Sequence, residues 1–236
     1  MEQKERRESR AERIRRVKRN RRILGLGIIT VGVIIAVAVI NPGRPSGGYG
    51  ESEGTFAGTS AGGGTAEDPG RPELDVQLLT PNEFSRPQIA LEQINGIVVH
   101  YTGNPGTTAQ ENRDYFEGLK DGSGTYASSH FVIGMDGEII QCIPSTEISY
   151  ASNDRNYDTL SIECCHPDES GQFTEATYQS LVNLTAWLCS HFDVPVDGVI
   201  RHYDVTGKEC PKYFVDHEDA WEQFRKDVAA REAELA

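Results

Sequence analysis

The sequence predicts an α/β domain over residues 75–230, built on a single mixed β-sheet that is flanked by helices. Three observations predict this class. Short apolar, β-branched runs alternate with amphipathic helical patterns, as they do where helices lie on the faces of a sheet. The turn Met135-Asp136-Gly137 separates two apolar runs and indicates a hairpin, so one pair of strands is antiparallel. The length of the region suits one domain, and the sequence shows no internal repeats.

The first predicted element is a buried strand over residues 94–102, because this segment is apolar and rich in β-branched side chains. A helix over residues 107–120 follows, with Thr107 or Thr108 as its N-cap. Residues 174–192 place apolar side chains on one helical stripe. The remaining predicted elements are strands at 131–134, 138–143, 160–165 and 198–202 and a C-terminal helix at 218–230.

A basic head and an uncharged apolar run precede the domain. Residues 1–22 carry eleven Lys or Arg and four Glu, and the eighteen residues 23–40 carry no charge. Eighteen helical residues span about 27 Å, close to the thickness of a bilayer core. We therefore expect one transmembrane helix at 23–40, with the head in the cytoplasm by the positive-inside rule. The alternative is a cleaved signal peptide with a small-residue site at Ala36-Val37-Ala38.

Residues 41–74 are expected to form a flexible linker between the membrane and the domain. Ten of the thirty residues 41–70 are glycine, and such a segment cannot bury enough apolar surface to fold. The chain would then be a single-pass protein of the cell membrane, with its N-terminus in the cytoplasm and its domain outside the cell. Its net charge of −13 argues against nucleic acid as a partner.

The sequence leaves two alternatives open for the oxidation state of the five cysteines. Disulfides are permitted outside the cell, although their pairing cannot be deduced from sequence, and buried free thiols are the other possibility. Cys164 and Cys165 are adjacent, so on a strand their side chains point to opposite faces. The five residues are Cys142, Cys164, Cys165, Cys189 and Cys210.

Two histidines and a cysteine stand near predicted strand ends. His100 closes the first apolar run, His202 closes the strand at 198–202, and Cys210 follows eight residues later. Two strand ends and a returning loop can meet at one edge of a sheet, and two histidines with a cysteine are a known ligand set of catalytic zinc. We therefore expect these three residues to hold a hydrolytic Zn²⁺ ion. The alternative for Cys210 is a disulfide.

Several motifs in this order resemble the type 2 N-acetylmuramoyl-L-alanine amidases. These are zinc hydrolases of peptidoglycan, similar in fold to phage amidase lysozymes and peptidoglycan recognition proteins. The resemblance covers about residues 90–215 and leaves out the head, the apolar run and the linker. The motifs are Val-Val-His-Tyr-Thr up to residue 102, Ser-Ser-His-Phe-Val-Ile-Gly-Met-Asp-Gly-Glu-Ile-Ile-Gln up to residue 141, Leu-Ser-Ile-Glu up to residue 163, and Arg-His-Tyr-Asp-Val-Thr-Gly-Lys-Glu-Cys-Pro up to residue 211.

The resemblance implies a role for five residues of this chain. The family's zinc ligands fall on His100, His202 and Cys210, its carboxylate on Glu163 and its lysine on Lys208. Zinc would lower the pKa of bound water and polarise the scissile carbonyl. Glu163 would pass a proton from the water to the leaving amine, and Lys208 would stabilise the oxyanion. The implied substrate is peptidoglycan, cut between N-acetylmuramic acid and L-alanine.

The role of His130 is left open, and the other polar residues receive no catalytic role. Some phage members have a tyrosine just before the strand histidine in place of the glutamate. Here Ser129 stands at that position, beside His130, so the chain follows the carboxylate subtype. We expect His166 and His217 at the surface, and Arg201 on a groove wall or at the surface.

Two further hypotheses compete with the membrane-anchored amidase. The first is a non-catalytic peptidoglycan-binding receptor on the same fold, although such receptors typically lack the cysteine ligand, which is present here as Cys210. The second is a hydrolase with Cys164 or Cys165 as nucleophile and His166 as its base. Adjacent residues on a strand point apart, which disfavours the thiol–imidazole contact that this chemistry requires.

Overall fold

The structure is a computed structural model that describes residues 68, 70–122 and 124–235. The predicted cytoplasmic head at 1–22, the predicted transmembrane helix at 23–40 and nearly all of the linker at 41–74 lie outside the described residues. Of the helices in the described ranges, none is both long enough and apolar enough to cross a bilayer.

The strands of the described residues form one six-stranded sheet in the order β1-β4-β3-β5-β2-β6. Only the β3–β4 pair is antiparallel, and the other neighbours run parallel. The predicted single mixed sheet is therefore confirmed. The strands are β1 (Asp75–Val76), β2 (Gly96–Tyr101), β3 (Phe131–Ile133), β4 (Ile139–Gln141), β5 (Thr159–Cys164) and β6 (Val199–Arg201).

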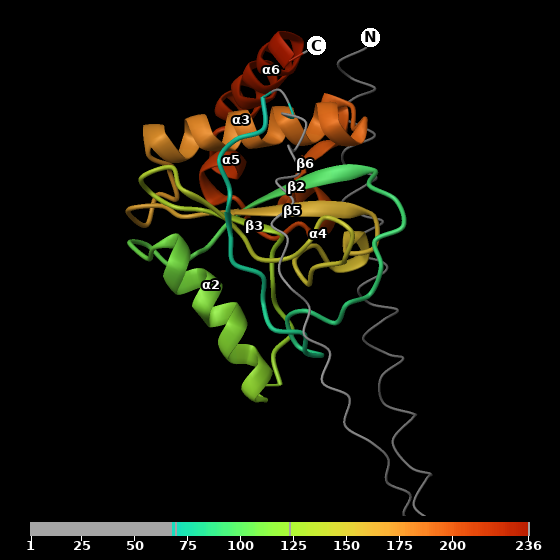
Figure 1. Cartoon of the computed structure of the whole chain (residues 1–236). Coiled ribbons are helices and arrows are strands. Elements are labelled where there is room, and N and C mark those ends of the chain that lie inside the picture. The colour runs from blue at the N-terminus through green and yellow to red at the C-terminus, as the bar shows by residue number, and fades with distance from the viewer. Residues whose placement is uncertain (1–67, 69, 123, 236) are drawn as a thin grey trace, which may run out of the picture. The chain divides into compact units, whose positions relative to one another are not determined.

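Helices cover both faces of this sheet. In Figure 1, α3 and α6 lie on one side of the strands and α2 lies on the other. Strands with helices on both faces read as near-continuous apolar runs, which is the pattern of Ile97 to Val99 in β2. The helices are α2 (Ala109–Gly118), α3 (Glu175–Phe192), α4 (His202–Thr206), α5 (Lys212–Asp216) and α6 (Glu218–Leu235), with short 3₁₀ helices η1 (Leu119–Asp121), η2 (Asn153–Arg155) and η3 (Val196–Gly198).

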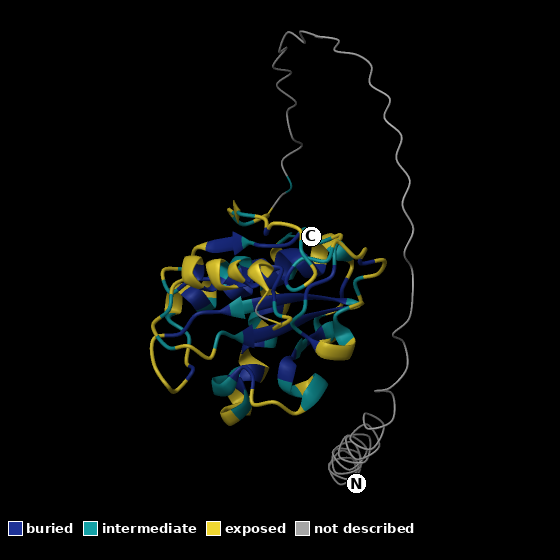
Figure 2. Ribbon diagram, turned by 90° about the horizontal axis from the view of Figure 1, so that it is seen from below, coloured by how far each residue is buried: buried dark blue, intermediate teal, exposed yellow. Residues whose placement is uncertain are grey.

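Two apolar clusters hold the layers together, and Figure 2 shows the buried strands between exposed helix surfaces. The larger cluster joins one face of β2 and β5, including Val99 and Ile162, to α3 and α6 through Leu184 and Phe224. The smaller cluster joins the opposite face of the sheet, through β3 and β4, to α2. Each fully buried large apolar side chain contributes roughly 1.5–3 kcal/mol relative to exposure, so the larger cluster dominates the stability of the domain.

Local sequence signals explain where several elements begin and turn. Thr108 is the N-cap of α2 and forms a reciprocal capping box with Glu111, which confirms one of the two predicted caps. The β3–β4 turn contains Gly137 with φ of 89°, a conformation that favours glycine. Strand β1 and helices α4 and α5 were not predicted, since each has only two to five residues and no clear periodicity.

All five cysteines are free and buried. Cys164 packs in the cluster under α3, whereas Cys165 packs in the cluster under α2. The adjacent thiols therefore point to opposite faces, as expected on a strand. Of the two alternatives for the cysteines, the structure has the buried free thiols.

Candidate metal centre

His100 is fixed by a buried strand that is paired on both of its edges. β2 is hydrogen bonded on both edges, to β5 and to β6, and the residues before the histidine, Ile97 to Val99, are fully buried. The His100 side chain is 1% exposed. It points away from the α3–α6 cluster, because neighbouring Val99 packs into that cluster and strand side chains alternate. The imidazole therefore lies on the same face of the sheet as α2.

His202 and Cys210 come from one returning segment after β6. The predicted strand stops one residue early, and His202 is the first residue of α4. The helix ends at Gly207, whose φ of 78° turns the chain back. The backbone amide of Tyr203 then donates to the carbonyl oxygen of Cys210 at 2.9 Å. This bond brings the thiol back beside the start of the helix.

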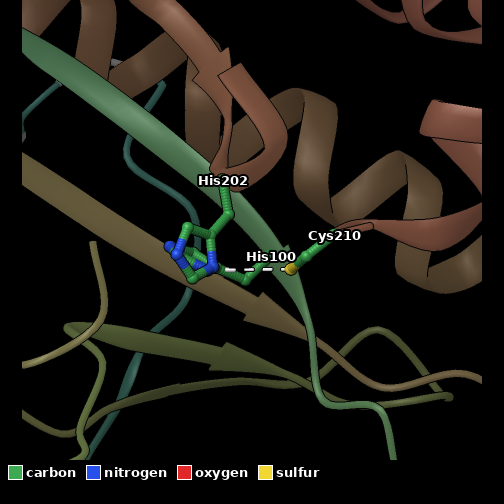
Figure 3. A group of neighbouring side chains, drawn as sticks. All are labelled: His100, His202 and Cys210. Atoms are coloured by element: carbon green, nitrogen blue, oxygen red, sulfur yellow. Dashed lines mark hydrogen bonds between the residues drawn. The ribbon is translucent and has the colours of Figure 1, made fainter. Parts of the chain in front are cut away.

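The three side chains converge, as Figure 3 shows. Their potential ligand atoms all lie within 4.8 Å of one another, and all three residues are buried. The Cys210 Sγ atom is 3.8 Å from His100 Nδ1, and the two imidazole centroids are 4.7 Å apart. The predicted juxtaposition of His100, His202 and Cys210 is thus confirmed, and these residues could hold a metal ion.

The Nε2 atom of each imidazole has a partner on one loop. His100 Nε2 is 3.2 Å from Ser152 Oγ, and His202 Nε2 is 3.1 Å from Asn153 Oδ1. An amide oxygen only accepts, so His202 carries its proton on Nε2 and its lone pair on Nδ1. A metal ligand of histidine type needs this arrangement, with one nitrogen free to bind and the other donating.

Burial keeps all three groups uncharged when no cation is near. It lowers the pKa of His100 well below its usual value and that of His202 to about 4, and the charge of Lys208 lowers both further. It raises the pKa of the Cys210 thiol to about 12, while the backbone amide of Tyr101 acts in the opposite direction. A bound cation would suit this set, because it binds neutral imidazoles and would deprotonate the thiol.

Glu163 stands directly beside the cluster. It is paired with His100 across the β2–β5 ladder, and its Oε1 atom lies 4.0 Å from His100 Nδ1. Its Oε2 atom is buried without a hydrogen-bond partner in the described structure, although the side chain is 18% exposed. Burial raises the pKa of Glu163 to about 8, and the nearby positive charge of Lys208 lowers it. A carboxyl with these properties is typical of proton-transfer sites.

Lys208 lies on the exposed side of the returning segment, two residues before Cys210. Its backbone amide donates to Thr206 Oγ1 at 3.2 Å. Its charge acts on His100, His202 and Glu163, so the ammonium group belongs to the electrostatic surroundings of the cluster.

Two residues near the motifs serve the scaffold instead. His130 is fully buried, with Nδ1 bonded to Ser161 and Nε2 2.9 Å from the carbonyl oxygen of Glu147. Ser129 donates to the carbonyl oxygens of Phe131 and Ser161, each at 3.0 Å. Neither hydrogen-bonds to the three clustered residues.

Two of the surface assignments are wrong. Arg201 is only 4% exposed and bonds to Asp204, Glu218 and the carbonyl oxygen of Phe214. Its charge can be buried because the carboxylates of Asp204 and Glu218 compensate it. Sequence spacing alone does not reveal this pairing. His166 is 1% exposed and stacks on Tyr101. The expected surface position of His217 is confirmed.

The structure gives no support to a cysteine nucleophile. Cys164 and Cys165 lie on opposite faces in separate apolar clusters. Burial raises the pKa of Cys164 well above its usual value and that of Cys165 to about 12. A thiolate is the nucleophilic form of cysteine, and both sites disfavour it.

Comparison with known protein families finds a match that includes these residues. A family model described as N-acetylmuramoyl-L-alanine amidase matches residues 90–213, a range that contains the whole cluster, Glu163 and Lys208. A probable N-acetylmuramoyl-L-alanine amidase of Bacillus licheniformis is 33% identical over 159 residues, covering 62% of this chain and 44% of the relative. The amidase BlyA of Bacillus subtilis is 29% identical over 171 residues, covering 64% of this chain and 45% of the relative. The chain thus spans less than half the length of these relatives.

Solved structures share the fold. The catalytic domain of XlyA superimposes with a TM-score of 0.57 at 23% identity, covering 66% of this chain and 99% of that domain. The PlyG catalytic domain gives a TM-score of 0.58 at 23% identity, covering 68% of this chain and 96% of that domain. At this identity the likeness concerns the fold alone, and it extends over almost the whole of each catalytic domain.

Proposed function

Because this chain belongs to the N-acetylmuramoyl-L-alanine amidase family, we propose that it hydrolyses the amide between N-acetylmuramic acid and L-alanine in peptidoglycan. We further propose that a zinc ion held by His100, His202 and Cys210 serves this reaction. The family match covers the region that carries all three residues. The finer assignment is supported by one observation, the convergence of these three donors beside Glu163.

The donor set fits zinc in number and in kind. Two imidazole nitrogens and one thiolate sulfur make three protein ligands, and catalytic zinc sites typically keep three and leave a fourth position open. The contacts of the two Nε2 atoms with Ser152 and Asn153 agree with ligation through the Nδ1 atoms. When bound, zinc lowers the pKa of a water molecule to about 7 and polarises a carbonyl group.

The residues beside the cluster divide the remaining chemistry. Glu163 presents a carboxylate whose buried oxygen has no competing partner in the described structure, so it can accept a proton from the attacking water and deliver it to the leaving amine nitrogen. The ammonium group of Lys208 would stabilise negative charge on the scissile carbonyl oxygen as it develops. Both groups approach from outside the ligand set, Glu163 from β5 and Lys208 from the exposed side of the returning segment.

Mass spectrometry of the products tests this function. Purified peptidoglycan is incubated with the full chain, and released fragments are analysed. We expect stem peptides that begin with a free L-alanine amine, together with glycan that carries the free lactyl carboxylate. Chelator should stop the release and zinc should restore it. Release of fragments cut at a glycosidic or peptide–peptide bond would contradict the assignment, and binding without any release would favour the non-catalytic receptor.

The site of action is a separate proposal that rests on the sequence. We propose that residues 23–40 anchor the protein in the cell membrane, with residues 1–22 in the cytoplasm and the hydrolase domain outside. Support comes from the excess of basic residues before an eighteen-residue uncharged run. A peptidoglycan substrate outside the membrane agrees with this orientation.

A further inference from the structure

We infer that Ser152 and Asn153 are a pair of positioning residues, which orient both histidines so that their inner nitrogens face the metal. The inference rests on the proposed metal centre and extends it to two residues that no sequence motif singled out. It also gives a function to the loop between β4 and β5, which touches the centre without supplying a ligand.

The geometry carries this inference. Ser152 Oγ lies 3.2 Å from His100 Nε2, and Asn153 Oδ1 lies 3.1 Å from His202 Nε2. Ser152 and His100 are each 1% exposed, so water does not compete for that bond. Two consecutive residues thus reach two histidines that come from β2 and from the start of α4 and are 102 positions apart in the chain. A single loop thereby sets the angle between the two imidazoles.

The loop is itself held rigidly. Asn156 Oδ1 accepts hydrogen bonds from the backbone amides of Ala151 and Ser152, at 3.1 and 2.6 Å. The Arg155 carbonyl oxygen accepts from Thr159 Oγ1 at 2.6 Å, which joins the loop to the first residue of β5. An acceptor on a tethered loop has little freedom to lose when the metal binds, so its hydrogen bond is available for orienting the ring.

The backbone at Asn153 is a second indication of a fitted position. Its φ of 53° lies in the left-handed region, which few residues other than glycine adopt. Asparagine is one of the tolerated exceptions, but glycine would adopt this φ with less strain. Asn153 therefore carries a side chain at a position where the backbone alone would favour glycine. The amide oxygen of that side chain contacts His202.

The proton positions follow from the chemistry of the acceptors. Asn153 Oδ1 can only accept, so His202 Nε2 must donate and its Nδ1 must hold the lone pair. Ser152 Oγ can take the donor or acceptor role, and it accepts when His100 Nδ1 binds the metal. Hydrogen bonds of this kind fix the tautomer and raise the basicity of a ligating imidazole, and their loss typically costs about 10–100-fold in metal affinity.

Zinc affinity of the full chain tests the inference without reference to turnover. The dissociation constant is measured by competition with a chromophoric chelator for wild type, Ser152→Ala, Asn153→Gly and Asn153→Asp. We expect zinc binding about 10–100-fold weaker in Ser152→Ala and in Asn153→Gly. Asn153→Asp keeps an acceptor at the same place, so its affinity should stay close to that of wild type.

Two measurements separate positioning from stability. Asn153→Gly suits the left-handed backbone, so thermal unfolding of its metal-free form should match that of wild type while zinc affinity falls. The visible spectrum of the cobalt-loaded chain should change in Ser152→Ala and Asn153→Gly, because it reports ligand geometry. Gln88→Gly is the matched control, since Gln88 is exposed and also has a left-handed φ, of 57°, and it should leave affinity and spectrum unchanged.

The outcomes are distinct. If wild type binds zinc and the Ala and Gly variants bind it equally tightly, the positioning role is wrong while the proposed metal centre stands. A drop in affinity that follows the unfolding temperature, or that Asn153→Asp fails to restore, also overturns the inference. If wild type binds no zinc, both the metal centre and the positioning role are overturned.

Discussion

Glu163 faces His100 across the parallel β2–β5 ladder, with 4.0 Å between the carboxylate Oε1 and the imidazole Nδ1. The two strands are each buried along most of their length and paired in register, which holds the two backbones in place. A strand register therefore sets the separation between a proposed proton carrier and a proposed metal ligand. Rigid strands hold such distances more tightly than loops do.

Glu163→Gln should retain zinc and lose turnover. The amide keeps the shape of the carboxylate but cannot accept a proton, and removing an acid–base group typically costs about 10²–10⁴ in rate. Steady-state release of stem peptide is measured beside zinc content and binding of wall fragments. Glu175→Gln on α3, across the sheet from the cluster, is the matched control and should remain active. Near wild-type turnover in Glu163→Gln would refute the assigned proton transfer but not the metal centre.

Lys208→Ala should lower turnover by roughly 10²–10³, the usual cost of removing an oxyanion-stabilising group. Lys208 is exposed and contributes no ligand atom, so the zinc content and thermal unfolding of the variant should not change. Lys208→Arg should recover part of the rate because it keeps the charge. Lys120→Ala, in η1 after α2, is the control for a lost surface cation. An equal effect of both alanine variants would show that Lys208 acts only through net charge.

Cys210→Ser should lose most of its zinc. The hydroxyl of serine is far harder to deprotonate than a thiol, and the two histidines alone leave the site one ligand short. We expect zinc affinity to fall by more than the roughly 10–100-fold that an outer hydrogen bond contributes. Elemental analysis after mild purification measures it. Cys189→Ser removes another buried free thiol, on α3, and should retain about one zinc per chain. Full zinc occupancy in Cys210→Ser would remove this residue from the ligand set.

His130 should make the metal-free domain lose stability in acid. Burial lowers its pKa to about 4 in the folded protein from the usual 6.5. The hydrogen bond to the Glu147 carbonyl oxygen and the charge of Glu147 act in the opposite direction. The Glu147 side chain is itself paired with Arg86. The folded state thus resists a proton that the unfolded state accepts. The contribution is fully present above pH 6.5 and is lost as the pH falls towards 4, by about 3 kcal/mol at most.

Urea unfolding with chelator present, repeated between pH 7.5 and 4, checks this. His130→Gln has no titrating group at that position, so its free energy of unfolding should fall less steeply with acid than that of wild type. The difference between the two proteins isolates His130 from the other histidines. Parallel curves would mean that His130 titrates normally.

The proposed orientation predicts that protease added to intact protoplasts releases a fragment of folded-domain size. The expected cleavage lies in the glycine-rich segment 41–74, because such a composition has no packed core to protect it. A lysed sample serves as the control for access. Protection of the domain in intact protoplasts would reverse the topology, and a soluble native protein that begins near Val39 would favour the cleaved signal peptide.

The sequence predicted the cluster because its members belong to strongly patterned elements. His100 closes an apolar run that could only be a buried strand, and His202 directly follows the shorter strand beside it. Cys210 required the motif as well, since its return depends on α4, a five-residue helix with no periodic signal. The hairpin at Gly137 and the amphipathic α3 were equally readable from local pattern.

What the sequence could not show depends on contacts between distant residues. Arg201 resembles a surface cation until Asp204 and Glu218 are placed around it. Ser152 and Asn153 lie in a polar loop of ordinary composition, and only the fold brings them within hydrogen-bond distance of two histidines. Positive φ at Asn153 offered no cue either, because asparagine occurs widely in turns.

The return turn makes the centre sensitive to chain length as well as to residue identity. From His202 to Cys210 the path runs through α4, the left-handed Gly207 and the Tyr203–Cys210 backbone hydrogen bond. One residue added inside the helix would rotate everything beyond it by about 100°, carrying the thiol off the imidazoles. A single-residue insertion there would therefore abolish metal binding although all three residues are still present in the sequence. We expect this stretch to tolerate no insertion or deletion.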